Sequence, residues 1–413
     1  MNIIRGGIMR SQPALDPRQA IHPRTRHGNT GFRIIGGTGQ DFDNTTQRTF
    51  RAMIEIAAPS FDAVRPIFST ERTAGGYTVT RCNARAAANF TDPVGTPTTV
   101  TLPGGGVVAA SAGTFLKTFM VGDWLTLPSI PRDDGGQGAI VIFDAYVSTA
   151  GTIGLLGSTT SGIGYNNYAT RSRHAHIWRR NAGDCVTTPA NFVSTTNDPT
   201  SIIVGVEYLH RGRIVTVMGL GDSVVSGNAG LLGAGYPLLA TERASDLSNI
   251  IFEYANVARD GATSAQFSTY LDSILSVGLN PDIMARPIGS SNDYFVNAIS
   301  SAQVANSRRY LAANLKTCSE NSIAQILWTM IPAGQASKTW GADDSLRRDY
   351  NDENLGLKGM NVLDFAAIMN GVMSVDGQMI PNLALVKADT VHPNDDGNAA
   401  LSVPLTERLL NVA

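Results

Sequence analysis

Two short segments, far apart in the second half of the chain, contain a nucleophile and a base that could activate it. Ser223 follows a glycine-rich turn and would begin a helix, so its own backbone N–H would be available to a negatively charged oxygen. His392 could accept the serine proton, and Asp389, three residues earlier, could orient and stabilise the imidazole ring. These residue types predict acyl transfer from an ester through a covalent serine intermediate.

The turn before Ser223 also has an ordinary structural interpretation. Gly221, Asp222 and Ser223 form a common turn triplet, so the serine could simply cap a helix. Asp222 is expected to order the turn by hydrogen bonding rather than to take part in the chemistry. The triplet alone does not separate capping from catalysis, and the residues around His392 favour catalysis.

Two more segments supply donors that could stabilise a tetrahedral oxyanion. Asn292 offers a side-chain amide and Gly261 an unobstructed backbone N–H. Each such donor is worth roughly 3 to 4 kcal/mol of transition-state stabilisation. Both segments follow predicted strands, and open α/β sheets bind their ligands at that carboxyl edge. We therefore expect an oxyanion hole made by Ser223, Gly261 and Asn292.

Strands and helices alternate from residue 212 to the end of the chain, which predicts an α/β domain with a doubly wound parallel sheet. The helix expected after Gly261 has its apolar residues on one face, Thr263 or Ser264 as its cap and Gly278 at its end. The predicted strands are residues 214–218, 250–254, 283–288, 323–330 and 361–365, and the predicted helices are residues 265–277, 296–318, 343–355 and 398–412.

Residues 33–211 follow a different pattern, in which short alternating strands are separated by glycine-rich turns. This pattern predicts an all-β sandwich or jelly-roll domain. The alanine-rich residues 83–90 could form one helical turn inside it. Residues 1–32 are polar, rich in arginine and without a period, so we expect an extended N-terminal arm that is disordered or grips a neighbouring domain or subunit.

The four segments, taken in order, resemble the SGNH hydrolases, also called the GDSL esterase and lipase superfamily, over residues 212–413. The family's serine block is similar to residues 221–223, its Asp-x-x-His block to residues 389–392, and its glycine block to Gly261. The resemblance implies a flavodoxin-like catalytic domain that hydrolyses esters with a Ser-His-Asp triad and without a metal or organic cofactor.

One block departs from the family's Gly-x-Asn-Asp pattern, because two serines separate Gly289 from Asn292. The extra residue falls inside the loop, and we expect Asn292 to point into the oxyanion hole despite it. The nucleophile turn of the α/β-hydrolases, Gly-x-Ser-x-Gly, fits less well, since Val225 stands at its second glycine.

The composition restricts the partners that the chain can have. With 43% hydrophobic residues it can bury a large core, and a formal net charge of -2 gives no reason to expect nucleic acid or an anionic membrane as a partner. No stretch approaches the length of a membrane span. The three cysteines lack metal-ligand spacing, so either Cys82 and Cys185 form a disulfide or, as we favour, the thiols are free and buried.

The expected substrate class comes from a looser likeness. Residues 122–127 and 131–133 resemble the β-sandwich modules that precede the catalytic domain in bacterial carbohydrate esterases, which implies an acetyl or other short acyl group on a saccharide. The alternatives are simple carboxylic esters, lipids, or a surface-binding or assembly protein with secondary hydrolase activity. Trp124 and Trp178 could stack on a sugar or, as we favour, pack in the core. The sequence leaves open whether the protein is a homo-oligomer and whether it is secreted or periplasmic.

Overall fold

The computed structural model of the protein describes residues 29–35, 38–73, 75–90, 96–113, 116–157, 175–195, 198, 200–227, 235–294, 300–335, 338–339, 344–357, 360, 362–375 and 377–413. Residues 1–28 of the arm expected at residues 1–32 lie outside the described residues.

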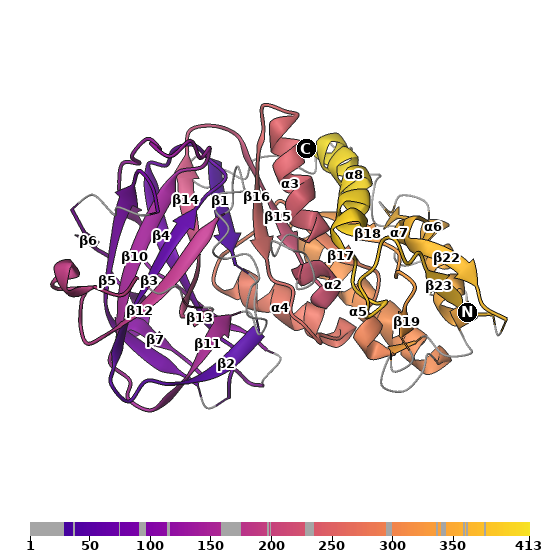
Figure 1. Ribbon diagram of the computed structural model, residues 1–413, viewed down its shortest axis with the longest axis horizontal. Coiled ribbons are helices and arrows are strands. Elements are labelled where there is room, and N and C mark those ends of the chain that lie inside the picture. The colour runs from indigo at the N-terminus through magenta and orange to yellow at the C-terminus, as the bar shows by residue number, and fades with distance from the viewer. Residues whose placement is uncertain are drawn as a thin grey trace.

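A mixed β-sheet crosses the molecule and joins the two halves of the chain (Figure 1). Its C-terminal part consists of parallel strands in the order β21, β18, β17, β15, β16, which is the flavodoxin-like order of a doubly wound sheet. The α/β arrangement expected for residues 212–413 is confirmed. These strands are β15 (Ile214–Gly219), β16 (Ile251–Asn256), β17 (Ile283–Pro287), β18 (Ala324–Trp328) and β21 (Val362–Leu363).

Helices cover both faces of the parallel strands. Val215 and Val217 of β15 share a buried cluster with α3 and α8, whereas Met218 shares one with α4 and α5, because successive side chains of a strand point to opposite faces. The helices are α2 (Ser223–Ser226), α3 (Tyr236–Asp246), α4 (Ser264–Ser276), α5 (Ser301–Glu320), α6 (Asp344–Leu355), α7 (Phe365–Met369) and α8 (Asp395–Val412).

Local signals explain where most of these helices begin. Helix α4 starts with a capping box between Thr263 and Gln266, and Gly278 follows it with a φ of +80°. Helix α3 was not predicted. It buries the small side chains Ala240 and Ala244 and packs against α8, so its apolar periodicity is weak.

The β-rich half contributes one layer to the same sheet and a second layer that faces it. Strands β14 (Ile203–His210), β4 (Ala63–Thr70), β8 (Thr118–Val121) and β9 (Leu125–Thr126) extend the mixed sheet with antiparallel pairing. A second antiparallel sheet has the order β12, β3, β10, β5, β6, with β7 on β5, and one buried cluster contains residues of both sheets. The independent sandwich domain at residues 33–211 stays a prediction, since one of these layers is continuous with the parallel strands.

The described part of the chain contains further strands. They are β2 (Thr38–Asp43), β3 (Arg48–Glu55), β5 (Tyr77–Ala87), β6 (Thr98–Thr99), β7 (Val107–Val108), β10 (Ile140–Val147), β11 (Thr152–Gly157), β12 (His176–Ala182), β13 (Thr200–Ser201), β19 (Gly334–Gln335), β20 (Lys338–Thr339), β22 (Asn370–Met373) and β23 (Met379–Pro381). The prediction of a helical turn at residues 83–90 is wrong. Ala84 and Ala86 belong to strand β5, and their side chains are buried in the hydrophobic cluster that contains residues of both sheets.

Strand β1 (Asn29–Ile34) joins the two halves. It pairs antiparallel with β14 and, at Ile34, parallel with β16. Phe32 and Ile34 bury their side chains at alternate positions, so the expected boundary of the arm at residue 32 falls inside a strand. Residues 211–213 connect β14 directly to β15.

Candidate active site

The turn after β15 places Ser223 at the first position of α2. Strand β15 lies between β16 and β17, where the direction of the connections reverses, and ligands of open α/β sheets bind at such a switch point. Asp222 caps the helix by accepting the Val224 N–H at 3.1 Å. Gly221 has no room for a side chain, since a Cβ there would lie 2.3 Å from the Val225 Cγ2.

Three side chains from the two expected segments form a continuous chain of hydrogen bonds. The Oγ of Ser223 lies 2.8 Å from Nε2 of His392, and Nδ1 of His392 lies 2.7 Å from Oδ2 of Asp389. The side chain of His392 is 15% exposed and that of Asp389 35%, so the site is partly open to solvent. Two segments that are 169 residues apart therefore meet at one edge of the sheet.

A tight turn fixes Asp389 beside the imidazole ring. Its Oδ1 accepts the backbone N–H of Val391 at 2.9 Å and of His392 at 3.0 Å. Thr390, between them, has a φ of +53° and accepts the Gly334 N–H at its carbonyl, at 3.0 Å. This left-handed conformation is unusual for threonine and bends the chain so that the carboxylate faces Nδ1.

The charge on Asp389 suits this position. Partial burial acts against the carboxylate, but the hydrogen bonds from the His392 and Val391 backbone and from the imidazole hold the pKa of Asp389 below its usual range. An anion at Nδ1 favours the tautomer that carries its proton there, which leaves Nε2 as the acceptor for the Ser223 hydroxyl.

Asp222 lies buried behind the serine and links its turn to the loop after β17. Its Oδ2 accepts the hydroxyl groups of Ser290 at 2.8 Å and Ser291 at 3.3 Å. Burial raises the pKa of Asp222, although the hydrogen bonds from Ser290 and Val224 act in the opposite direction. These contacts agree with the ordering role expected for this carboxyl group.

The two expected oxyanion donors lie in the loops that follow the strands on either side of β15. Asn292 belongs to the 3-10 turn Ser291–Asp293 after β17, and its Nδ2 donates to the Ala262 carbonyl at 3.1 Å. The same Nδ2 also lies 3.5 Å from the Oγ of Ser290. Gly261 follows β16 with a φ of +76°, a conformation that favours glycine. Their role as donors to an oxyanion stays a prediction.

The sequence pattern did not identify Ser290, one of the two serines between Gly289 and Asn292, as part of the site. This serine is fully buried, and its Oγ lies 2.8 Å from Asp222 Oδ2 and 2.7 Å from the Ala262 carbonyl. The same oxygen accepts the Asn292 N–H at 3.1 Å. The available signal was the departure from Gly-x-Asn-Asp, because it places two serines before Asn292, and a serine is small and can both donate and accept.

The expectations for the two tryptophans have different outcomes. Trp178 is 1% exposed, as favoured, but Trp124 is 40% exposed and lies under the Arg65 guanidinium at 4.7 Å. Cys82, Cys185 and Cys318 are free and buried. Within the described ranges, no group of three or more His, Cys, Asp or Glu residues could hold a metal ion. Among the helices of these ranges, none has the length and apolar character that a membrane span requires.

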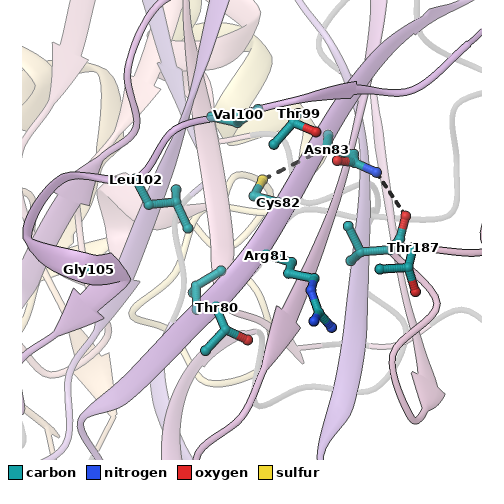
Figure 2. A pocket seen from close by; sticks show the side chains of 11 residues that line it. Thr80, Arg81, Cys82, Asn83, Thr99, Val100, Leu102, Gly105 and Thr187 are labelled. Carbon is teal, nitrogen blue, oxygen red and sulfur yellow. Dashed lines mark hydrogen bonds between the residues drawn. The ribbon is translucent and has the colours of Figure 1, made fainter.

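A cavity of about 590 Å³ opens in the β-rich half, beside the part of β5 that lies between β6 and β7 (Figure 2). Polar side chains of Thr80, Arg81 and Thr187 line it together with the apolar Leu102. Asn83 also lines the cavity, and its Nδ2 donates to the Val186 carbonyl at 2.8 Å. None of Ser223, His392 and Asp389 lines this cavity, so it is separate from the site at Ser223.

Comparison with known proteins gives matches of structure but not of sequence. No protein-family model and no curated protein matches the chain. Many solved structures that are similar to it are GDSL lipases and esterases. They include a GDSL-like lipase from Bacteroides thetaiotaomicron (14% identity, TM-score 0.36, 49% of this chain and 89% of that one), a psychrotrophic esterase from Pseudoalteromonas (16%, 0.36, 47% and 96%) and an acetyl xylan esterase (19%, 0.35, 47% and 100%).

Proposed function

We propose that the protein hydrolyses carboxylic esters and that Ser223, His392 and Asp389 are its catalytic residues. The observation that carries this proposal is the hydrogen-bonded chain of 2.8 Å from Ser223 to His392 and 2.7 Å from His392 to Asp389. A serine hydroxyl is a weak nucleophile unless a base takes its proton, and here the base and the group that orients it are both in contact.

In the proposed reaction, the Oγ of Ser223 attacks the carbonyl carbon of the ester while its proton passes to Nε2 of His392. The carbonyl oxygen becomes negative. When the tetrahedral intermediate collapses, the bond to the alcohol oxygen breaks, that oxygen takes the proton from His392, and the acyl group stays on Ser223. Water then attacks the acyl-enzyme with His392 as its base, which releases the carboxylic acid and restores the serine.

The negative oxygen requires donors that are already in place. We assign this role to the backbone N–H groups of Ser223 and Gly261 and to the side-chain amide of Asn292. Donors fixed in advance stabilise the transition state without reorganising as the charge develops. Ser290 and Asp222 support this arrangement, because they connect the serine turn with the Asn292 loop.

For the substrate we propose a short acyl group, in particular acetyl, on a saccharide. The support is the resemblance of residues 122–127 and 131–133 to modules of carbohydrate esterases, together with the polar side chains of Asp260, Ser291 and Asn292 in the loops that flank the serine turn. Hydrolysis rates on acetylated oligosaccharides and on p-nitrophenyl acetate, butyrate and palmitate would test this. A preference for palmitate would favour the lipid alternative.

The catalytic assignment is tested by Ser223→Ala. We expect a loss of about a thousandfold or more in kcat on p-nitrophenyl acetate, with an unchanged circular dichroism spectrum. A fluorophosphonate should label Ser223 in the wild-type protein, as mass spectrometry of the peptides would show. Ser276→Ala, at the end of α4, is the matched control and should keep full activity. A folded Ser223→Ala variant with full activity would refute the assignment.

A further inference from the structure

The peptide bond between Asp260 and Gly261 lies at the centre of a β-turn. The Arg259 carbonyl accepts the Ala262 N–H at 3.1 Å, which closes the turn over residues 259–262. Gly261, the third residue, has a φ of +76°, whereas Asp260 is not among the residues with a positive φ. These are the features of a type II turn.

The central peptide of such a turn can rotate without breaking the hydrogen bond that closes the turn. Types I and II differ by about 150 to 170° in the ψ of the second residue and the φ of the third, which amounts to a rotation of the central peptide. In a planar trans peptide, the C=O of Asp260 and the N–H of Gly261 point in opposite directions. A group that holds this carbonyl therefore also aims this N–H.

The guanidinium of Arg259 holds that carbonyl. Its Nη1 donates to the Asp260 oxygen while its Nε donates to the carboxylate of Glu71. Glu71 is 0% exposed and Arg259 6% exposed, so water does not weaken the pair. A rigid planar guanidinium can make both contacts at once, which an ammonium group cannot do in the same geometry.

The β-rich half supplies the other side of this contact. Glu71 directly follows β4, and Thr70 of that strand pairs with Thr118 of β8. Lys117, just before β8, places its Nζ 3.4 Å from the Val257 carbonyl in the same loop. Two neighbouring strands of the β-rich half thus reach the loop that contains Gly261.

We propose that the Glu71–Arg259 pair is a positioning device that locks the Asp260–Gly261 peptide with its N–H toward the reacting carbonyl oxygen. The inference rests on the proposed function, because it requires Gly261 to be an oxyanion donor. If the peptide rotated, the Asp260 oxygen would take the place of the N–H, and the negative oxygen of the transition state would face the negative end of a dipole. The proposal assigns neither Glu71 nor Arg259 a contact with the substrate.

The test is Arg259→Lys, which keeps a positive charge beside Glu71 but loses the double contact. We expect kcat on p-nitrophenyl acetate to fall about tenfold to a hundredfold while KM stays within about threefold, since the donor acts on the transition state. A boronic acid that forms a tetrahedral adduct with the serine should lose affinity by a similar factor. A folded Arg259→Lys variant with wild-type kcat would overturn the proposal.

Arg85→Lys is the matched control. Arg85 is a buried arginine that shares the Asp144 carboxylate, at 2.8 Å, with a second arginine in the β-rich half. The Arg85→Lys variant should keep the wild-type kcat. If its kcat fell as much as that of Arg259→Lys, any destabilisation of the β-rich half would lower activity, and the proposal would be overturned. Should Arg259→Lys fail to fold, Glu71→Gln gives the second test, with a smaller loss that is again confined to kcat. An unchanged kcat in folded Glu71→Gln would count against the proposal equally.

A double-variant cycle separates positioning from general loss of stability. Gly261→Ala should itself lower kcat, because a positive φ is unfavourable for alanine. If Arg259 acts through Gly261, adding Arg259→Lys should cause little further loss, whereas losses that multiply would contradict the proposal. Activity that survives Ser223→Ala would overturn the proposed function itself. An inactive Ser223→Ala beside a fully active Arg259→Lys would overturn the positioning role alone.

Discussion

Replacing Lys117 with methionine should change how the stability of the protein depends on alkaline pH. Lys117 is 4% exposed, and its Nζ lies 3.4 and 3.5 Å from the carbonyls of Val257 and Ala258. Burial, opposed in part by the nearby carboxylate of Glu71, lowers the pKa of Lys117 from its usual 10.5 to about 8. The folded protein therefore releases this proton at a lower pH than the unfolded chain does.

The sign and size of the effect follow from proton binding. Between about pH 8 and about pH 10.4, the unfolded chain holds the Lys117 proton and the folded protein does not, so the free energy of unfolding rises with pH. Below about pH 8 both states hold it, and the cost of the buried charge is fully present. A difference of about 2.5 in pKa corresponds to on the order of 3 kcal/mol across this window.

Urea unfolding, followed by tryptophan fluorescence from about pH 7 to about pH 10.5, would measure this difference. The wild-type protein should gain stability relative to Lys117→Met as the pH rises. Lys316→Met is the control, because that side chain is 76% exposed and its removal should leave the pH dependence as it was. If wild type and Lys117→Met showed the same dependence, the buried charge assigned to Lys117 would be wrong.

Three further changes to the chain test the site and the fold. Asp389→Asn should lower kcat about ten-thousandfold in a folded protein, because the anion that stabilises protonated His392 is lost. Folding lowers the pKa of Asp389, so its carboxylate adds stability above about pH 4, and this stability is lost as the pH falls further. Thermal melts should therefore show that the wild-type protein becomes less stable relative to Asp389→Asn at acid pH. Asn292→Ala should lower kcat much more than it raises KM, and steady-state kinetics showing only a raised KM would remove Asn292 from the oxyanion hole. A fragment of residues 212–413 should be poorly soluble when expressed alone, because removing β1 leaves the edge of β16 unpaired; a soluble, active fragment would show that the β-rich half is detachable.

The local parts of the fold were predictable from short stretches of sequence. The apolar run of β15, the cap and glycine stop of α4, and the alternation of strands and helices each depend on residues within about one element of each other. Helix α3 was not predicted, because Ala240 and Ala244 give a weak apolar period although both are buried. The alanines at positions 84 and 86 misled in the opposite direction, since their helix propensity was overridden by packing in β5.

The candidate site divides in the same way. The sequence by itself determined the chemical types, Ser223, His392 and Asp389, and the order in which their segments follow strands or precede the last helix. Tertiary structure alone decided that Ser290 joins Asp222 to the Asn292 loop and that Glu71 holds Arg259 from a position 188 residues away. Residue types and periodicity are written in neighbouring positions, whereas an ion pair or a strand pairing across the molecule exists only once the chain has packed, because many alternative partners are equally compatible with the local sequence.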